Sequence, residues 1–486
     1  MSKLLFSHSY FYRFDPKQWA TKQPYPPLGT ITAAAQMREM GHEVALFDTC
    51  LVEDETGLLP RLETFQPNYL VLYDDGFNYL TKMCLTNMRE AAFRMAQMAK
   101  ARGIPVIVSS SDSTDHFEQY LDEGADYIIL GEGEATLQEL IDTLNSGTSS
   151  VDRVSGLAYR KAGKTVKTPK RPVLRDLDNL PMAAWDLVDV EPYRQIWIEG
   201  NGYFSLNVAT TRGCPFKCNW CAKPIYGNRY NSRSPDHVLH EIAWLLENYK
   251  PDHFWMCDDI FGLKPQWVQQ FRNKVNETDL RFRYKIQSRA DLLVKEDTID
   301  ALGESGLHEV WIGAESGSQK ILDAMDKGTK LEQIYEATRL LKKKGIRVCF
   351  FLQFGYLGEN QEDIRKTIDM VLELMPDNIG ISVSYPLPGT KFYEIVKEEL
   401  SAKANWTDSD DLDMMFEGTY SSEYYKRLHR YVHKVYRRKQ GLLAMKGILK
   451  PNNWSAPQLR SMLATAYYAP AALVDARKLE RLAQVK

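Results

Sequence analysis

The chain has 486 residues, of which 44% are hydrophobic and 26% charged, so it is long enough for two or three globular domains. Its formal net charge of −3 provides no strong basic field, and we expect no nucleic-acid partner.

Targeting and membrane signals are missing from the sequence pattern. The opening MSKLLFSHSYFYRFDP meets aromatic and charged residues almost at once and has no small-residue cleavage site, so we expect no signal peptide. No run of about 18 apolar residues predicts a transmembrane segment. Seven cysteines, three of them clustered, do not suggest a disulfide framework. We therefore expect a reduced, cytoplasmic protein.

Residues 1–147 alternate between short apolar runs and helix-like segments. The runs KLLFSH, HEVALFD, YLVLYDD, IPVIVSS and ADYIILGEGE are typical of buried parallel strands. Helices are predicted over 30–40, 80–100 and 135–144. Five strand–helix units predict a doubly wound α/β domain, in which ligands bind beyond the carboxyl ends of the strands.

Small and polar residues follow four of these predicted strands. The loops are PYPPLGT (24–30), DDGFN (74–78), SSSDST (109–114) and GEGE (131–134). Proline, glycine and serine also make ordinary turns, so one such loop alone indicates little. Four of them at one edge favour a site for a large polar ligand.

Residues 148–204 are interpreted as a connector, with a hairpin in GLAYRKAGKTVKT and an ordered linker in DLDNLPMAAWDL. A second alternating series occupies 205–400. Its strands are predicted in SLNVATT, HFWMCDD, RFRYKIQ, EVWIGAE, RVCFFLQFG and IGISVSY, with helices over 235–247, 266–275 and 331–344. Six units predict a partial parallel (β/α)6 barrel with its site at the carboxyl ends of the strands.

Residues 401–486 are predicted to be helical. The basic run YYKRLHRYVHKVYRRKQ is interpreted as a solvated helix face, with a substrate cap or a partner surface as alternatives.

The stretch TRGCPFKCNWCAKP (211–224) carries three of the seven cysteines, Cys214, Cys218 and Cys221, just after the first strand of the predicted barrel. Thiolates hold zinc or iron–sulfur clusters. A structural zinc site needs a fourth ligand, but no second cysteine pair follows, and His237 and His240 lie on a predicted helix. A four-iron cluster held by three thiolates leaves one iron open for a small molecule. The pattern therefore favours an iron–sulfur site.

With this placement the chain resembles the radical S-adenosylmethionine (SAM) superfamily. The resemblance implies a [4Fe-4S] cluster on the three cysteines, shielded by Trp220, whose open iron chelates the amino and carboxylate groups of SAM. It also implies that an electron from the cluster cleaves SAM to a 5′-deoxyadenosyl radical, and that a donor such as flavodoxin or ferredoxin supplies the electron. The protein's part is orientation and a dry pocket.

The same resemblance implies a set of SAM contacts at strand ends. In CDDIF, either Asp258 or Asp259 replaces the glycine-rich motif that receives the SAM amino group in many relatives. Arg289 in QSRAD is assigned to the carboxylate and Glu315 in GAESGS to the ribose. For each acidic residue a helix cap or a solvated carboxylate is the alternative. The full set of implied SAM contacts is Asp258, Asp259, Gln287, Arg289, Glu315 and Tyr385.

The amino-terminal domain resembles the cobalamin-binding domain of cobalamin-dependent radical SAM enzymes, through YPPLG before a helix, GHEVALFD and ADYIILGEGE. The Asp-x-His-x-x-Gly pattern that ligates cobalt is absent, His116 lacks that context, and serines stand where relatives often have glycines at 109–112. The resemblance implies these cobalamin contacts: Pro27, Leu28, Gly29, Asp74, Ser110, Ser111, Gly131, Glu132, Gly133 and Glu134.

Within this class the pattern is similar to the group around the anaerobic magnesium-protoporphyrin monomethyl ester oxidative cyclase and the carbon and phosphorus methylases. The implied reaction is methylation or oxidative cyclisation of an unactivated position in a small organic substrate, whose identity the motifs do not indicate. Two alternatives remain. A methylthiotransferase needs a third amino-terminal cysteine beside Cys50 and Cys84, and a non-catalytic cobalamin or iron–sulfur sensor needs no substrate cavity.

Overall fold

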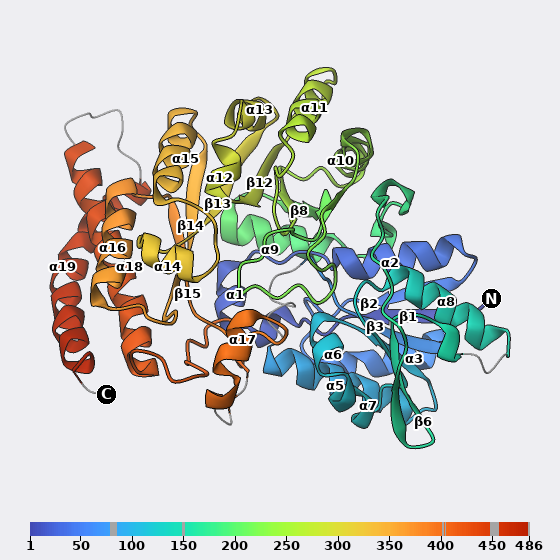
Figure 1. Ribbon diagram of the computed structural model, residues 1–486. Coiled ribbons are helices and arrows are strands. Elements are labelled where there is room, and N and C mark those ends of the chain that lie inside the picture. The colour runs from blue at the N-terminus through green and yellow to red at the C-terminus, as the bar shows by residue number, and fades with distance from the viewer. Residues whose placement is uncertain (78–84, 148–150, 401–402, 404, 448–455, 485–486) are drawn as a thin grey trace.

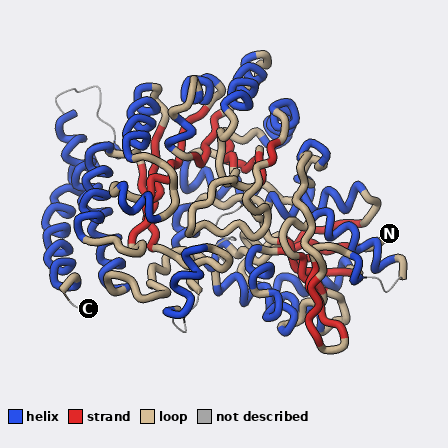
Figure 2. The backbone as a smooth tube through the Cα atoms, viewed as in Figure 1, coloured by secondary structure: helices blue, strands red, loops and turns tan. Residues whose placement is uncertain are grey.

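Two sheets, one mostly parallel and one wholly parallel, come from the two alternating halves of the sequence and form the cores of two domains that lie side by side (Figure 1). The computed structural model describes residues 1–77, 85–147, 151–400, 403, 405–447 and 456–484. Helices cover the sheets and form the carboxyl-terminal layer, while loops gather between the two domains (Figure 2). The predicted α/β class is confirmed.

The first sheet is doubly wound, because its apolar strands are buried between helices on both faces. Its order is β2(Glu43–Phe47), β1(Lys3–Ser7), β3(Tyr69–Tyr73), β4(Val106–Ser109), β5(Tyr127–Ile129), β6(Leu157–Lys161) and β7(Lys164–Lys167). The first five strands are parallel. The helices are α2(Leu28–Glu39), α3(Leu58–Phe65), α5(Thr86–Lys100), α6(Ser111–Asp115), α7(Phe117–Asp122) and α8(Glu134–Asn145).

Two features of this sheet differ from the sequence prediction. The hairpin assigned to the connector pairs antiparallel with β5 and extends the first sheet to seven strands. Helices α3, α6 and α7 were not predicted, because their segments are short and interrupted. The predicted helix over 80–100 begins at Thr86, and its earlier part falls in 78–84, outside the described residues.

The second sheet has six parallel strands arranged in chain order, as expected for a partial (β/α)6 barrel. They are β8(Ser205–Val208), β11(His253–Met256), β12(Arg283–Ser288), β13(Leu307–Glu315), β14(Arg347–Phe354) and β15(Asn378–Val383). Helices α10(Pro235–Tyr249), α11(Pro265–Asn276), α12(Ala290–Leu293), α13(Thr298–Glu304), α15(Leu331–Lys343) and α16(Gln361–Leu374) accompany them. A small hairpin of β9(Thr211–Arg212) and β10(Asn231–Ser232) frames the cysteine loop.

The connector ties the two domains together through α9(Glu191–Asn201). The indole of Trp197 donates to the carbonyl of Pro24 at 2.7 Å, and Asn207 of β8 donates to the carbonyl of Pro26 at 3.0 Å. The Tyr25 ring packs against Trp197 and Trp255. The loop after β1 is therefore fixed on the edge of the barrel.

The carboxyl-terminal layer contains α17(Lys391–Val396), α18(Ser422–Gly447) and α19(Ala456–Leu482). The basic run predicted to be a solvated face lies on α18, and only part of it is solvated. Tyr425, Val432 and Tyr436 are buried, and the Tyr436 hydroxyl donates to the carbonyl of Pro376 at 2.6 Å. In the described part of the chain no helix has the length and apolar character needed to cross a membrane.

Candidate functional site

The cysteine loop leaves the barrel at the carboxyl end of β8 and lies between β9 and β10. Its turn requires glycine at 213, since φ is +80° there and a Cβ would lie 2.4 Å from the carbonyl oxygen of Arg229. Further along, Lys223 Nζ donates to the carbonyl of Phe216 at 2.8 Å and closes the loop on itself.

Asn219, between the second and third cysteines, anchors the loop to the opposite side of the barrel. Its amide donates to the carbonyl of Ala324 at 2.7 Å, at the end of α14(Gln319–Ala324), and its Oδ1 accepts from the Tyr356 hydroxyl at 2.7 Å. Its backbone carbonyl accepts from the N–H of Phe392 at 2.9 Å. The loop therefore has a defined position.

The three thiols are partly exposed and not disulfide-bonded. Burial raises the pKa of Cys221 to about 11 and also raises the pKa of Cys214. Lys223 opposes both shifts, whereas Asp259 and Cys218 add to them. No set of three or more His, Cys, Asp or Glu side chains within the described ranges is arranged to hold a metal ion.

Arg289, which follows β12, faces the second cysteine. Its Nη1 donates to Cys218 Sγ at 3.7 Å, and its guanidinium lies 3.7 Å from the centre of the Phe216 ring. The other guanidinium nitrogens donate to Asp291 Oδ1 at 2.8 Å and to the carbonyl of Lys327 at 2.6 Å. Arg289 thus places a positive charge beside the loop, and its contacts with Asp291 and Lys327 hold its side chain in position.

Lys327 is a second buried cation at this site, and the sequence analysis missed it. Its Nζ donates to Glu315 Oε1 at 2.7 Å, and both side chains are only 7% exposed. Burial alone would lower the pKa of Lys327, but Glu315 and Cys218 raise it above its ordinary value. A lysine after a short helix gives no local signal, and only the fold brings it to Glu315 at the end of β13.

The two aspartates of CDDIF have different surroundings in the structure. Asp258 is buried, and its Oδ1 accepts the backbone N–H groups of Thr210 at 2.7 Å and Thr211 at 2.9 Å, while its Oδ2 accepts the Thr210 hydroxyl. Burial raises the pKa of Asp258 to about 6. Its role here is to anchor the strand that leads to the cysteines. Asp259 instead lies near the thiols, whose pKa values it raises.

The two remaining predicted SAM contacts, Gln287 and Tyr385, lie at the carboxyl ends of β12 and β15. The carbonyl of Gln287 accepts the N–H of Phe261 at 2.9 Å. The Tyr385 hydroxyl is hydrogen bonded to Asn405, and its ring lies 4.4 Å from that of Trp406. Tyr385 therefore joins the barrel to the carboxyl-terminal layer.

The carboxyl edge of the first sheet faces the end of the cysteine loop. A small pocket there is lined by Tyr73, Asp74, Gly76, Ser109, Ser111, Ile225 and Tyr226. A Cβ at Gly76 would lie 3.2 Å from the Tyr226 hydroxyl, and one at Gly131 would lie 3.6 Å from the carbonyl of Ile225. The residues that follow the third cysteine thus cover the edge at which the sequence analysis placed cobalamin.

Most polar groups predicted at this edge have protein partners. Asp74 accepts the N–H and hydroxyl of Ser9 at 2.7 and 2.8 Å. Ser110 forms a capping box with Ser113 at the start of α6, where Ser111 is buried. At Gly133 a Cβ would lie 2.6 Å from the Tyr73 ring.

The N-terminus of α2 lies at the same edge. Pro27 precedes the helix, Leu28 is buried at its start, and the N–H of Gly29 donates to Asp75 at 3.1 Å. His116 lies 3.8 Å from Asp112. Whether any of these edge residues contacts cobalamin stays a prediction.

Glu132 and Glu134 make a buried ion pair with Arg212 of the barrel. Arg212 Nη1 donates to Glu132 Oε1 at 2.6 Å, and Nη2 donates to Glu134 Oε1 at 2.7 Å. All three side chains are under 10% exposed, and the guanidinium lies over the rings of Phe77 and Tyr226. Arg212 stands two residues before the first cysteine, so the pair joins the first domain directly to the loop.

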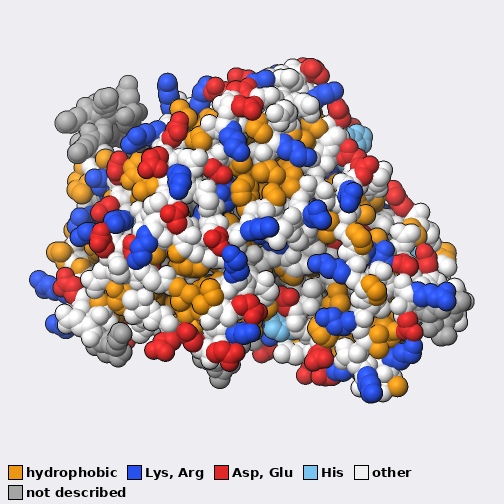
Figure 3. All heavy atoms as spheres, viewed as in Figure 1, with side chains coloured by type: hydrophobic (Ala, Val, Ile, Leu, Met, Phe, Trp, Pro, Cys, Tyr) orange, Lys and Arg blue, Asp and Glu red, His pale blue; other side chains and the backbone are white. Residues whose placement is uncertain are grey.

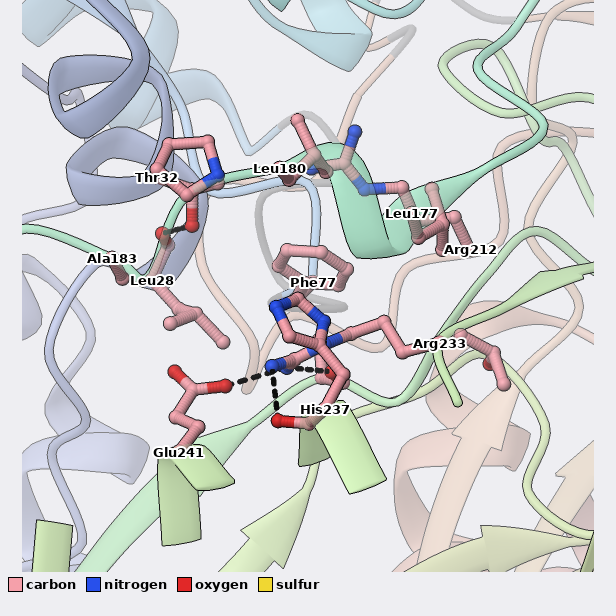
Figure 4. A pocket seen from close by; sticks show the side chains of 13 residues that line it. Leu28, Thr32, Phe77, Leu177, Leu180, Ala183, Arg212, Arg233, His237 and Glu241 are labelled. Atoms are coloured by element: carbon pink, nitrogen blue, oxygen red, sulfur yellow. Dashed lines mark hydrogen bonds and ion pairs between the residues drawn. The ribbon is translucent and has the colours of Figure 1, made fainter. Parts of the chain in front are cut away.

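A second pocket lies beside this ion pair, between α2, the connector and α10. Figure 4 shows Arg233, His237 and Glu241 meeting at one wall, where Arg233 Nη1 donates to Glu241 Oε2 at 2.5 Å. His237, considered above as a metal ligand, is thus held by Arg233, whose Nε donates to its ring at 3.1 Å.

Comparisons with known proteins agree with this arrangement. A profile described as the radical SAM superfamily matches residues 208–371. An uncharacterised methyltransferase of Pyrococcus horikoshii is 27% identical over 396 residues, which cover 80% of this chain and 82% of the relative. The anaerobic magnesium-protoporphyrin IX monomethyl ester cyclase of Synechocystis is 25% identical over 397 residues, covering 80% and 76%.

Two solved structures share the fold at low sequence identity. The radical SAM methyltransferase TsrM from Kitasatospora setae, with cobalamin and a [4Fe-4S] cluster bound, has a TM-score of 0.69 and 18% identity, over 82% of this chain and 75% of its own. The cobalamin-dependent radical SAM enzyme OxsB, with aqua-cobalamin bound, has a TM-score of 0.73 and 17% identity, over 98% and 72%.

We predict that Arg212→Met lowers the free energy of unfolding by ~3–5 kcal/mol, because it leaves two buried carboxylates without their cation. Thermal or denaturant unfolding measures the effect. The triple variant Arg212→Met, Glu132→Gln, Glu134→Gln should recover part of the loss, since no buried charge remains. Arg38→Met is the control: its pair with Asp186 is exposed, so the cost should stay below about 1 kcal/mol. Equal losses for Arg212→Met and Arg38→Met would contradict the prediction.

Proposed function

We propose that this chain, in which residues 208–371 form a radical SAM domain, is a cobalamin-dependent enzyme that cleaves SAM reductively and methylates or oxidatively cyclises an unactivated position of a small organic substrate. The observation that carries the proposal is the cysteine loop itself. Three thiols stand on an anchored loop at the carboxyl edge of the barrel, beside Arg289, Lys327 and Asp259.

In this proposal Cys214, Cys218 and Cys221 hold a [4Fe-4S] cluster, which when bound supplies the electron that cleaves SAM. The chemistry of the donors fits such a group, since three thiolates are soft ligands that leave one iron open. The three thiols are not arranged around a single metal ion in this structure, so in this proposal they converge when the cluster assembles. Arg289 and Lys327 place positive charge beside Cys218, where the negative charge of a thiolate-bound cluster would lie. Asn219 keeps the loop in place while the cluster assembles.

The residues around the thiols also suit the polar ends of SAM. Asp258 accepts hydrogen bonds from Thr210 and Thr211 and holds the strand before the loop. We therefore assign the SAM ammonium to Asp259, which lies near the thiols. Arg289 already holds Asp291 and the Lys327 carbonyl, and we assign the SAM carboxylate to its side that faces Cys218. We assign the ribose to Glu315, which Lys327 orients.

Cobalamin belongs to the proposal because the fold is that of TsrM and OxsB, whose structures contain it. When bound it supplies a methyl group or assists an oxidation. The carboxyl edge of the first sheet faces the cysteine loop, so a ligand bound there would lie near the thiols. The pocket at this edge is, however, much smaller than a corrin ring. Binding there requires Ile225 and Tyr226 to move away from Gly76 and Gly131. We therefore assign no chemical step to this group.

Reductive cleavage of SAM is the direct test. We predict that the anaerobically reconstituted protein binds about four irons and forms 5′-deoxyadenosine with SAM and dithionite, whereas Cys218→Ala forms none and lacks the cluster absorbance. Cobalamin uptake by this variant should persist, because the implied contacts lie in the other domain. Cys349→Ala, a core cysteine of β14, is the matched control and should keep both properties.

Three outcomes would contradict the proposal. Undiminished SAM cleavage by Cys218→Ala would contradict the assignment of the cluster to the three cysteines. Cobalamin uptake without any SAM cleavage in the parent protein would favour a sensor. Iron well above four per chain would favour a methylthiotransferase with an auxiliary cluster.

The two aspartates provide a second prediction with opposite readouts. Asp259→Asn should weaken SAM binding by about tenfold, as expected for loss of one charge-assisted hydrogen bond. Asp258→Asn should lower the melting temperature, because the loop before the cysteines loses an anchor. Titration of SAM against the cluster spectrum, together with thermal unfolding, measures both. If Asp258→Asn alone impaired SAM binding while the fold stayed intact, the assignment would be reversed.

Lys327 provides a third prediction. Lys327→Met leaves the Glu315 carboxylate buried without its cation, so SAM should no longer alter the electron paramagnetic resonance spectrum of the reduced cluster. Lys327→Arg, which keeps the charge, should restore part of that change. Lys320→Met removes a half-exposed ion pair from the neighbouring α14 and is the control. An unchanged spectral response in Lys327→Met would show that the lysine does not position SAM.

A further inference from the structure

The carboxyl-terminal helices α18 and α19 form a hairpin that packs on itself and leaves one long face uncovered. Gly441 of α18 lies against Ser461 and Thr465 of α19. Farther along, Arg427 and Lys434 of α18 bind the buried Asp475 at 3.0 and 2.6 Å. These contacts fix which side of α19 faces α18 and therefore which side faces outward.

The outward side of α19 is a row of large apolar side chains. Positions separated by three, four or seven residues share one face of a helix, and several exposed hydrophobic residues of α19 follow such spacings. We call this row the α19 apolar face; its members and their exposed fractions are Leu459 42%, Leu463 78%, Tyr467 64%, Leu473 62% and Val474 51%. Singly exposed leucines are ordinary, but a contiguous row of this kind marks an interaction site.

The segment of the sequence that contains α18 and α19 is strongly basic. Residues 421–486 contain 14 Lys and Arg but only 3 Asp and Glu, in a chain whose formal net charge is −3. Of those acids, Asp475 is buried and paired. On α19 itself Arg460, Arg477, Lys478 and Arg481 are exposed. Figure 3 shows hydrophobic and basic side chains together along the left edge of the molecule, where Figure 1 places α19.

We propose that the α19 apolar face docks on an anionic lipid surface. A helix that lies in a membrane interface inserts apolar side chains at the boundary of head groups and acyl chains, while Lys and Arg bind lipid phosphates. The α19 helix has both parts. In this proposal the attachment is peripheral, with α19 lying along the lipid surface.

Two other occupants fit the face less well. A second copy of the chain would bring two strongly basic surfaces together, and like charges repel across an interface. A nucleic acid would bind the basic residues but would leave the α19 apolar face in water, since nucleic-acid binding is dominated by phosphate contacts. Of these three occupants, the lipid surface is the one that uses the apolar side chains and the cations together.

Flotation of the full-length protein with lipid vesicles tests the proposal. Vesicles of an equimolar mixture of phosphatidylcholine and phosphatidylglycerol should carry the protein upward, and vesicles of phosphatidylcholine alone should carry much less. Raising the salt concentration should reduce binding to the mixed vesicles, because exposed charges are screened. The measurement needs no SAM and no activity, so its failure is separate from failure of the proposed function.

Paired variants identify the surface. Leu463→Ser with Tyr467→Ser, and separately Arg477→Glu with Lys478→Glu, should each lower the vesicle partition coefficient by about tenfold. All four residues are exposed, so the fold should stay intact, as circular dichroism and the melting temperature will show. The matched controls make the same changes elsewhere: Ile198→Ser with Ile395→Ser, which are 50% and 60% exposed, and Arg281→Glu with Arg283→Glu.

Any of four results would overturn the proposal. The first is that the parent protein fails to float with the mixed vesicles, and the second is that the α19 variants float as well as the controls. The third is a dimer, seen by light scattering without lipid, that only the Leu463 and Tyr467 variant loses; it would assign the face to a second copy. The fourth is RNA binding that is tighter than binding to the mixed vesicles and that is lost in the same variants.

Discussion

The buried contact of Arg212 with Glu132 and Glu134 is the interaction on which the arrangement of the two domains depends. A guanidinium withdrawn from water is costly unless its hydrogen bonds are satisfied, and here two carboxylates from the first domain satisfy it. Since Cys214 follows two residues later, the position of the first thiol is set from across the domain boundary. The loop is therefore as much a part of the interface as of the barrel.

The far side of the loop is fixed by the barrel and by α17. Asn219 is bound by groups from three separate segments, and Arg289 and Lys327 form a chain of contacts from Glu315 to the Cys218 thiol. These cations have a direct electrostatic effect, because they favour a negative group that binds beside the loop. The same geometry explains why two neighbouring aspartates have different roles, because one faces the backbone of the preceding strand and the other lies near the thiols.

The first domain presents its ligand edge to this loop, yet the edge is covered. Ser110 and Ser113 cap a helix there, Asp74 is held by Ser9, and Tyr226 lies against Gly76. Charge is also distributed unevenly along the chain. The acidic excess lies in residues 1–420, while the last helices are basic and carry an apolar outer face, so the surface for docking is separate from the site for chemistry.

Most of the fold was predictable from the sequence, because apolar runs of strand length and the helix periodicity between them are local properties. The spacing of Cys214, Cys218 and Cys221 is local as well, and together with its place after the first strand of the predicted barrel it predicts a cluster with an open iron. The tertiary structure decided what no local pattern contains: that Glu132 and Glu134 bind Arg212, that the connector hairpin completes the first sheet, that Asp258 is an anchor, and that Lys327 meets Glu315. Each of these joins residues that are distant in the chain or alike in type, and their partners are chosen by burial and charge balance in the folded protein.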